Sequence, residues 1–172
     1  MRLSPRVRKF ALGAHLVFAD GWIGAVIVYL ALGVAASSSA DTQIVRAAWI
    51  AMELTGWFVI VPLALASLLT GLLMALGTSW GLFRHYWVLF SLLLTIFATV
   101  VLLLHMPDVT MLADAARAAP LEGAEAADRV ARLGSGDLLH PALGLVVLLT
   151  IQVLNVYKPA GLTPYGRRRS AT

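Results

Sequence analysis

Long apolar stretches, rather than alternating apolar and polar positions, dominate this sequence. Because no segment alternates with period two, the pattern does not predict β-strands. As helices rising 1.5 Å per residue, the four longest stretches measure about 30 to 45 Å, and the hydrocarbon layer of a bilayer is about 30 Å thick. The pattern therefore predicts a single all-α domain over residues 1–172, a bundle of four transmembrane helices at 10–36, 47–76, 86–106 and 138–157.

Two interruptions add detail to this bundle. Pro62 lies near the middle of the second stretch and lacks a backbone N–H, so we expect a kink there. The connection 107–137 has helical spacing of apolar residues beside charged faces, and Pro120, Gly134 and Gly136 punctuate it. It predicts an outer loop with short amphipathic helices, whose apolar positions are Val109, Leu112, Ala116, Val130 and Leu133.

Composition supports a lipid environment. Apolar residues make up 60% of the chain, charged residues only 13%, and the mean hydropathy is +0.85. Since soluble domains carry about a quarter charged residues, a water-soluble monomer is excluded, and so is a disordered chain. The absence of cysteine excludes disulfides, thiolate metal sites and iron–sulfur clusters.

The distribution of charge predicts the orientation in the membrane. Nine cations without acidic neighbours share one side: Arg2, Arg6, Arg8, Lys9, Arg84, Lys158, Arg167, Arg168 and Arg169. An excess of Lys and Arg marks the cytoplasmic side, so we expect both termini in the cytoplasm and the chain in a bacterial inner (plasma) membrane. The basic pI of about 10 then reflects topology, and no nucleic-acid partner is expected.

The N-terminal region permits a second interpretation. A basic start, an apolar run and then Ser38-Ser39-Ala40 resemble a signal peptide with a small-residue cleavage site. The apolar run is too long for a usual signal peptide and Asp20 interrupts it, which favours an uncleaved first helix.

Two carboxyl groups lie within the predicted spans. On the first helix Asp20 shares a narrow stripe with Gly13, Gly24 and Ala31, and His15 and Trp22 lie on nearly the opposite one. Small residues let helices approach closely, so we expect this stripe to pack inward. Glu53 aligns similarly with small residues of the second helix, which are Gly56, Ala64, Ser67 and Gly71. These acids are either an intramembrane proton site or packing groups that hydrogen-bond across helices.

The four histidines fall into two levels. Alternating topology places His105, His140 and Glu53 near the outer boundary, where they are candidate ligands for haem b, copper or zinc. His15 and His85, near the inner boundary, are secondary candidates. His85 and His105 are 20 residues apart, about 30 Å along a helix, and cannot ligate one haem. The alternative is that all four are interfacial or packing residues.

Several residues near the inner boundary are typical membrane anchors. They are Arg84, Trp87, Lys158, Arg167, Arg168 and Arg169. The C-terminal block, in which Pro159 stops the last helix, is interpreted as an anchor on anionic lipid, and a protein-docking motif is the alternative.

Five sequence blocks carry a resemblance to a known family. They are GWIG at 21–24 after His15, MELTGWFVIVP at 52–62, LTG at 69–71, WGLFRHYWVL at 80–89 and VYKPAGLTPYG at 156–166. With these blocks the chain resembles a family of bacterial four-helix integral membrane proteins with a domain of unknown function. The start of the first helix is more distantly similar to copper-resistance D and HemJ-type proteins, which implies copper handling or haem-linked redox chemistry. Such relatives carry a lysine in the third helix, where this chain has Ser91.

The sequence thus favours a non-enzymatic membrane protein that binds haem b or a transition metal for electron transfer or metal handling. A proton-coupled carrier of small solutes using Asp20 and Glu53 is one alternative, and an accessory membrane subunit is another. The expected partners are the lipid bilayer and either a membrane-protein partner or further copies of the chain. No Walker loop, H-E-x-x-H motif or G-x-S-x-G motif indicates an enzyme.

Overall fold

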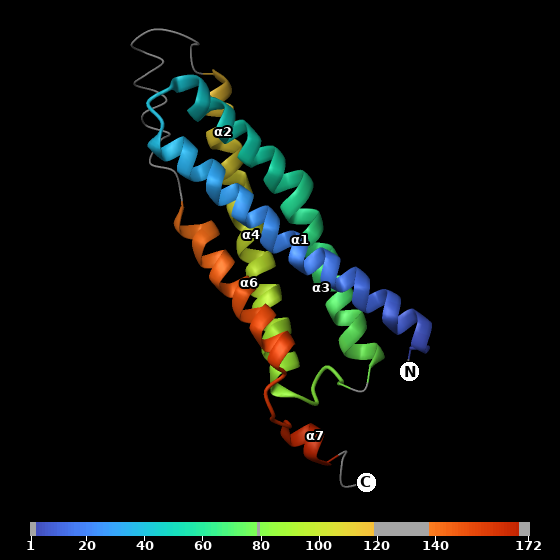
Figure 1. Ribbon diagram of the computed structural model, residues 1–172. Helices are drawn as coiled ribbons and strands as arrows, with labels where there is room; N and C mark the ends of the chain where they lie inside the picture. The colour runs from blue at the N-terminus through green and yellow to red at the C-terminus, as the bar shows by residue number, and fades with distance from the viewer. Residues whose placement is uncertain (1–2, 79, 119–137, 169–172) are drawn as a thin grey trace. The chain divides into compact units, whose positions relative to one another are not determined.

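The four predicted spans are confirmed as helices in a computed structural model, which describes residues 3–78, 80–118 and 138–168. In these residues every regular element is a helix (Figure 1). The elements are α1 (Pro5–Ser38), α2 (Thr42–Thr55), the π-helix η1 (Gly56–Ile60), α3 (Val61–Gly77), α4 (Tyr86–Ala118), α6 (Leu139–Tyr157) and the short α7 (Pro164–Arg168). Because α2, η1 and α3 follow one another without a break, Thr42–Gly77 forms the second span.

The outward faces of these helices are apolar. Phe10, Phe58 and Leu104 are each at least 74% exposed, and they belong to a long series of exposed large apolar side chains. Soluble proteins rarely expose contiguous apolar surface on this scale. Hydrocarbon therefore suits these faces better than water, and helices that satisfy their own backbone hydrogen bonds can cross it.

The third span is longer than predicted. It does not end at Met106 but continues through Pro107 to Ala118, so the first amphipathic part of the predicted outer loop is the end of α4. Burial of Val109, Ala113 and Ala116 explains the continuation, because their packing offsets the hydrogen bond that a helix loses at proline. The rest of the predicted loop, including Pro120, Val130 and Leu133, lies outside the described residues.

A π-helical turn precedes Pro62, the position at which the sequence predicts a kink. Pro62 cannot donate to the carbonyl four residues before it, and in the turn that precedes it Val61 N–H donates to Gly56 O, five residues back. The wider turn keeps Met52, Gly56, Ile60 and Ala64 buried, although they are spaced four residues apart. In a regular α-helix three such steps would rotate the position by about 120°.

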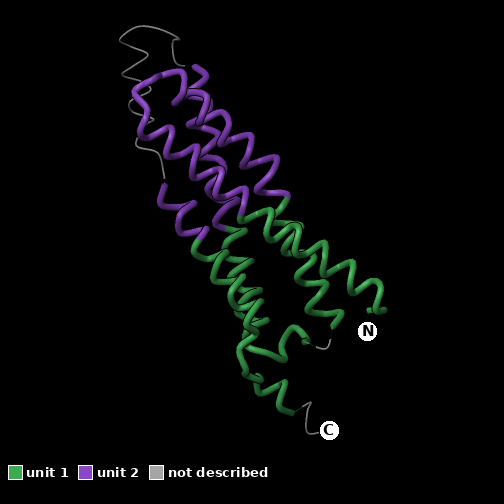
Figure 2. Tube along the Cα trace, viewed as in Figure 1, with its two compact units in different colours: residues 1–23, 63–100, 146–172 green, residues 24–62, 101–145 purple. Residues whose placement is uncertain are grey.

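The chain divides into two compact units (Figure 2). Unit 1 comprises residues 1–23, 63–100 and 146–172. In it Leu3 N–H donates to Gly77 O, which ties the start of α1 to the end of α3, and Asp20 contacts Gln152 of α6. Trp22 and Ala64 are among its most buried residues.

Unit 2 comprises residues 24–62 and 101–145. Its largest fully buried side chains come from α2 and α4, and they are Trp49, Met52, Met106 and Val109. At Gly33 the side chain of Leu138 comes so close that an added Cβ would lie 2.7 Å from it. The lack of a side chain at Gly33 thus allows close packing in this unit.

The packing face predicted for the first helix is wrong. Gly13, Asp20 and Gly24 are exposed, and a Cβ added at either glycine would meet nothing within 4 Å. The opposite stripe packs instead, with Trp22 and Tyr29 at 3% and 5% exposure. Burying large aromatic side chains removes more apolar surface from contact with solvent than burying glycine does. On the second span the predicted face is confirmed, because Gly56, Ala64 and Ser67 are buried.

Candidate functional site

The outer histidines lie together in unit 2. The rings of His105, on α4, and His140, on α6, stack with centroids 4.5 Å apart and an angle of 14° between their planes. The expectation that these two imidazoles reach the same level is therefore confirmed. The contact alone does not show that they bind a ligand.

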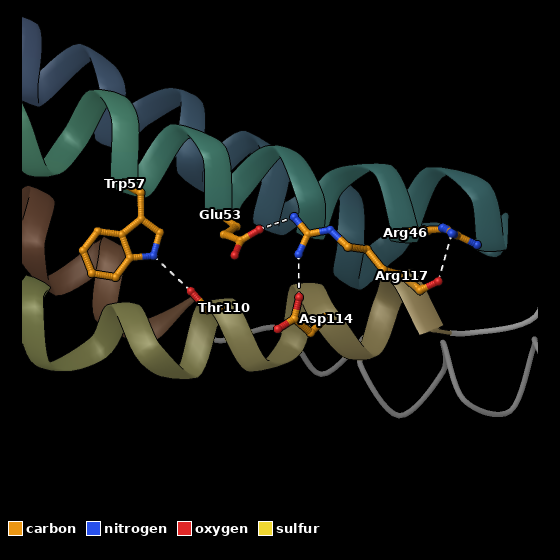
Figure 3. Close-up of polar contacts among 6 residues, drawn as sticks. All are labelled: Arg46, Glu53, Trp57, Thr110, Asp114 and Arg117. Atoms are coloured by element: carbon orange, nitrogen blue, oxygen red, sulfur yellow. Dashed lines mark hydrogen bonds and ion pairs between the residues drawn. The ribbon is translucent and has the colours of Figure 1, made fainter.

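Glu53 forms an ion pair rather than a three-residue cluster with these histidines (Figure 3). One guanidinium nitrogen of Arg117 binds the Glu53 carboxylate, and the other donates to Asp114 at 2.7 Å. Arg46 donates to the backbone carbonyl of Arg117 at 3.0 Å. The Glu53 side chain is only 13% exposed, so the guanidinium supplies the opposite charge that a largely buried carboxylate requires.

A second contact joins α2–η1 to α4 one helical turn further along. The indole N–H of Trp57 donates to Thr110 Oγ1 at 3.0 Å, as Figure 3 also shows. Together with the Glu53–Arg117 pair it forms a polar seam between the second and third spans. Directional hydrogen bonds of this kind fix the register of two helices.

The outer residues do not fit a haem held between the two imidazoles. Axial metal–nitrogen bonds are about 2 Å long, which puts the centroids of two opposed imidazole ligands on the order of 6 Å apart. The rings of His105 and His140 instead lie face to face at 4.5 Å. Among residues 3–78, 80–118 and 138–168 no group of three His, Asp or Glu side chains is placed to hold a metal ion.

A cavity of about 410 Å³ lies within unit 1. Residues from α1, α3, α4 and α6 line it, and its walls are aliphatic at Leu12, Leu68, Leu92 and Ile151. Its size is within the range of about 300–1,000 Å³ typical of ligand pockets. The sequence pattern had not predicted a cavity.

Polar groups interrupt the apolar wall of this cavity. His15, Ser67, Ser91, Thr95 and Asn155 all line it. The Nδ1 atom of His15 is 3.0 Å from Thr70 Oγ1, and the imidazole also lies against Gly71, where a Cβ would come within 3.1 Å of it. The small residue at 71 thus leaves room for the ring at the cavity wall.

Cations and aromatic rings line the cavity near the ends of its helices. Lys158 directly follows α6 with φ 45°, a left-handed conformation common after helix C-termini. Its Nζ lies 5.5 Å from the centroid of the Trp80 ring, in cation–π geometry. Arg8 and Lys9, from the first turns of α1, line the same cavity. No acidic side chain lines it among the residues that the structure describes.

His85 is not among the residues that line the cavity. Its Nδ1 contacts Trp80 O at 2.8 Å, and its ring packs against the rings of Trp80 and Trp87. The C-terminal block returns to the same loop, because Thr163 N–H donates to Arg84 O at 3.0 Å. His85 therefore belongs to a folded segment that joins the loop before α4 to α7.

The remaining predicted site residues differ in their exposure. Asp20 is exposed and accepts a hydrogen bond of 3.1 Å from Gln152 Nε2, so it pairs with α6 as a packing group would. Trp87 lines the cavity and is 9% exposed. Arg167 and Arg168 end α7, and Arg169 lies outside the described residues.

Sequence reasoning missed the partner of Glu53 and the inner cavity. Arg117 was placed in a loop, so no helical spacing connected it with residue 53. Ser91 entered the sequence analysis only as the position where the distant relatives carry a lysine. The cavity could not be predicted because it forms between side chains of four chain segments, and no local sequence pattern encodes their contacts.

The fold and sites described above define an all-α integral membrane protein with four long apolar helices. The family described as predicted integral membrane protein (DUF2269) matches residues 11–159, and the chain belongs to that family. No curated protein and no solved structure matches the chain. The resemblance to a four-helix membrane family is thus confirmed, and the more distant resemblance to copper-resistance D and HemJ-type proteins stays a prediction.

Proposed function

We propose that this protein binds a small ligand within the membrane, and that the unit 1 cavity is the binding site. The observation that carries the proposal is a volume of about 410 Å³ that residues of four membrane-spanning helices line with both apolar and polar groups. Protein interiors are normally packed as densely as organic crystals. A volume of this size among well-formed helices therefore favours an occupant over a packing defect.

The polar lining supports the same proposal. Hydroxyl, amide and imidazole groups are costly inside a bilayer unless they have partners or a role. Here they converge on one cavity from four chain segments, through His15, Ser67, Ser91 and Asn155. A few polar groups in an apolar pocket are typical of sites that orient a ligand.

Two matched substitutions test the proposal. Leu92 lines the cavity, whereas its neighbour Leu93 is 52% exposed on the outward face of α4. Leu92→Trp fills the cavity and Leu93→Trp does not. We expect mass spectrometry of gently solubilised protein to find a bound molecule in the wild type and in Leu93→Trp, but not in Leu92→Trp. Equal occupancy in all three proteins, or none in any, would overturn the proposal.

Electron transfer or metal handling at the outer histidines is a second candidate function. His105 and His140 lie side by side, and their stacked rings would have to reorient before both imidazoles could bind one copper or zinc ion. An absorption spectrum and metal analysis of protein from haem- and metal-replete cells test it. Colourless, metal-free protein would end this hypothesis without affecting the cavity.

A proton-coupled carrier and an accessory subunit are further hypotheses. The carrier requires that Asp20→Asn or Glu53→Gln alter proton-linked uptake in liposomes while the fold is kept. The accessory role requires that a larger complex co-purify with the chain. For any of these functions we propose an inner-membrane location with both termini in the cytoplasm, as the basic residues of the two ends favour.

A further inference from the structure

The two ends of the unit 1 cavity differ in charge. Arg8 and Lys9 line it from the first turns of α1, and Lys158 lines it directly after the end of α6. From Arg8 to Ala19, which also lines it, α1 advances eleven residues, or about 16 Å. The cavity is therefore an elongated space whose cationic end is near the helix termini and whose deeper walls are mainly aliphatic.

Trp80 and Trp87 give the cationic end a defined structure. The two rings meet edge to face with centroids 5.3 Å apart, and Lys158 lies over the first of them. An ammonium held over an indole keeps its charge available to a further anion. With three cations and no acid among the described lining residues, this end is suited to an oxyanion.

Ser91 points to a second polar group on the ligand. It is 7% exposed and lines the cavity, yet its Oγ has no hydrogen-bond partner among residues 3–78, 80–118 and 138–168. By contrast, Thr70, Thr95, Thr99 and Thr150 each donate to the carbonyl four residues earlier. A buried hydroxyl without a partner destabilises the folded protein. An acceptor on a bound molecule would remove that cost.

Taking the proposed ligand-binding function as given, we infer that the cavity binds an anionic single-chain amphiphile. Its oxyanion head lies among Arg8, Lys9 and Lys158, a carbonyl oxygen near the head accepts from Ser91 Oγ, and its chain follows the aliphatic wall. Ser91 lies one helical turn, about 6 Å, beyond Trp87 along α4, so it is deeper in the cavity than the aromatic pair at the cationic end. The volume accommodates the head and the adjoining part of one chain.

Native mass spectrometry of the full chain in neutral detergent tests this inference with four probes of defined chemistry. They are 1-acyl lysophosphatidate, its 1-alkyl ether analogue without the ester carbonyl, the neutral monoacylglycerol of equal chain length, and inorganic phosphate. We expect lysophosphatidate to bind at least about tenfold more tightly than monoacylglycerol. Inorganic phosphate should not compete at equal concentration.

Variants separate the two polar contacts. Lys158→Gln should weaken the binding of lysophosphatidate about fivefold to tenfold. Arg167→Gln is the matched control, because Arg167 is an exposed cation of α7 that does not line the cavity, and it should leave this binding unchanged. Ser91→Ala should weaken the binding of the 1-acyl ester several-fold and should hardly change the binding of the 1-alkyl ether analogue. An equal effect on ester and ether would overturn the assignment of Ser91.

The outcomes also distinguish this inference from the proposed function. If monoacylglycerol binds as tightly as lysophosphatidate and Leu92→Trp abolishes both, the cavity is a ligand site but its anionic ligand class is wrong. If inorganic phosphate alone binds and displaces lysophosphatidate, the ligand is a free oxyanion. If no probe binds and Leu92→Trp changes no bound molecule from the membrane, both proposals fail.

Discussion

The ion pair between Glu53 and Arg117 ties the second span to the third. Glu53 was recognised from its depth in a predicted span, but its partner Arg117 is 64 residues away along the chain. Ion pairs between helices depend on where each helix ends, and the end of α4 was placed twelve residues too early (Met106 rather than Ala118). Candidate residues inside a span are thus predictable, whereas their partners beyond its predicted end are not.

At this scale we predict that Glu53→Gln lowers the melting temperature in detergent by a few degrees. The substitution leaves Arg117 without its least exposed counter-charge. Asp114→Asn is the matched control, because its carboxylate binds the same guanidinium but is 66% exposed, and its effect should be smaller. A larger loss for Asp114→Asn than for Glu53→Gln would contradict this account.

At the scale of elements, the number of membrane-spanning helices was predicted correctly, but the face of α1 that packs inward was not. The apolar stretches located all four, because length and hydropathy decide whether a segment can span a bilayer. The inward face of α1 was wrong because a stripe of small residues was preferred over Trp22 and Tyr29. In a helix that is apolar on every side, the hydrophobic pattern does not distinguish packing from lipid contact.

The orientation of α1 gives the second prediction. Gly13→Ala and Gly24→Ala should leave the stability unchanged or raise it by up to about 1 kcal/mol, because each new methyl group meets open space and alanine favours the helix. Trp22→Ala should cost about 3–5 kcal/mol, because the indole is 3% exposed. Thermal unfolding in one detergent measures all three. Marked destabilisation by both glycine substitutions would show that the stripe of Gly13, Asp20 and Gly24 is the packing face of α1.

For the whole molecule, composition predicted the medium but not the internal space. A chain with 13% charged residues and four spans belongs in lipid, and the family match agrees. The unit 1 cavity arises because side chains from four segments leave a volume unfilled, which depends on packing rather than on any local period. The candidate site was therefore only partly accessible from the sequence, through His15, Trp87, Ser91 and Lys158.

The proposed topology gives the third prediction, and the lack of native cysteine makes its measurement clean. Ala40 lies between α1 and α2 and Ala160 follows α6, and both residues are exposed. In spheroplasts an impermeant maleimide should label Ala40→Cys at once, and Ala160→Cys only after lysis. The reverse pattern would place the termini outside and contradict the proposed topology.

The π-helical turn at Gly56–Ile60 has a consequence for the length of the second span. A turn that closes over five residues holds one residue more than an α-helical turn. If one residue were deleted from Gly56–Ile60 and Pro62 were replaced, the π-helical turn would become a regular α-helical turn. The side chains before and after it would then keep their present directions around the helix axis. The same loss within α3 would rotate every residue beyond it by about 100°. Gly56–Ile60 is therefore where related chains are free to shorten by one residue without repacking.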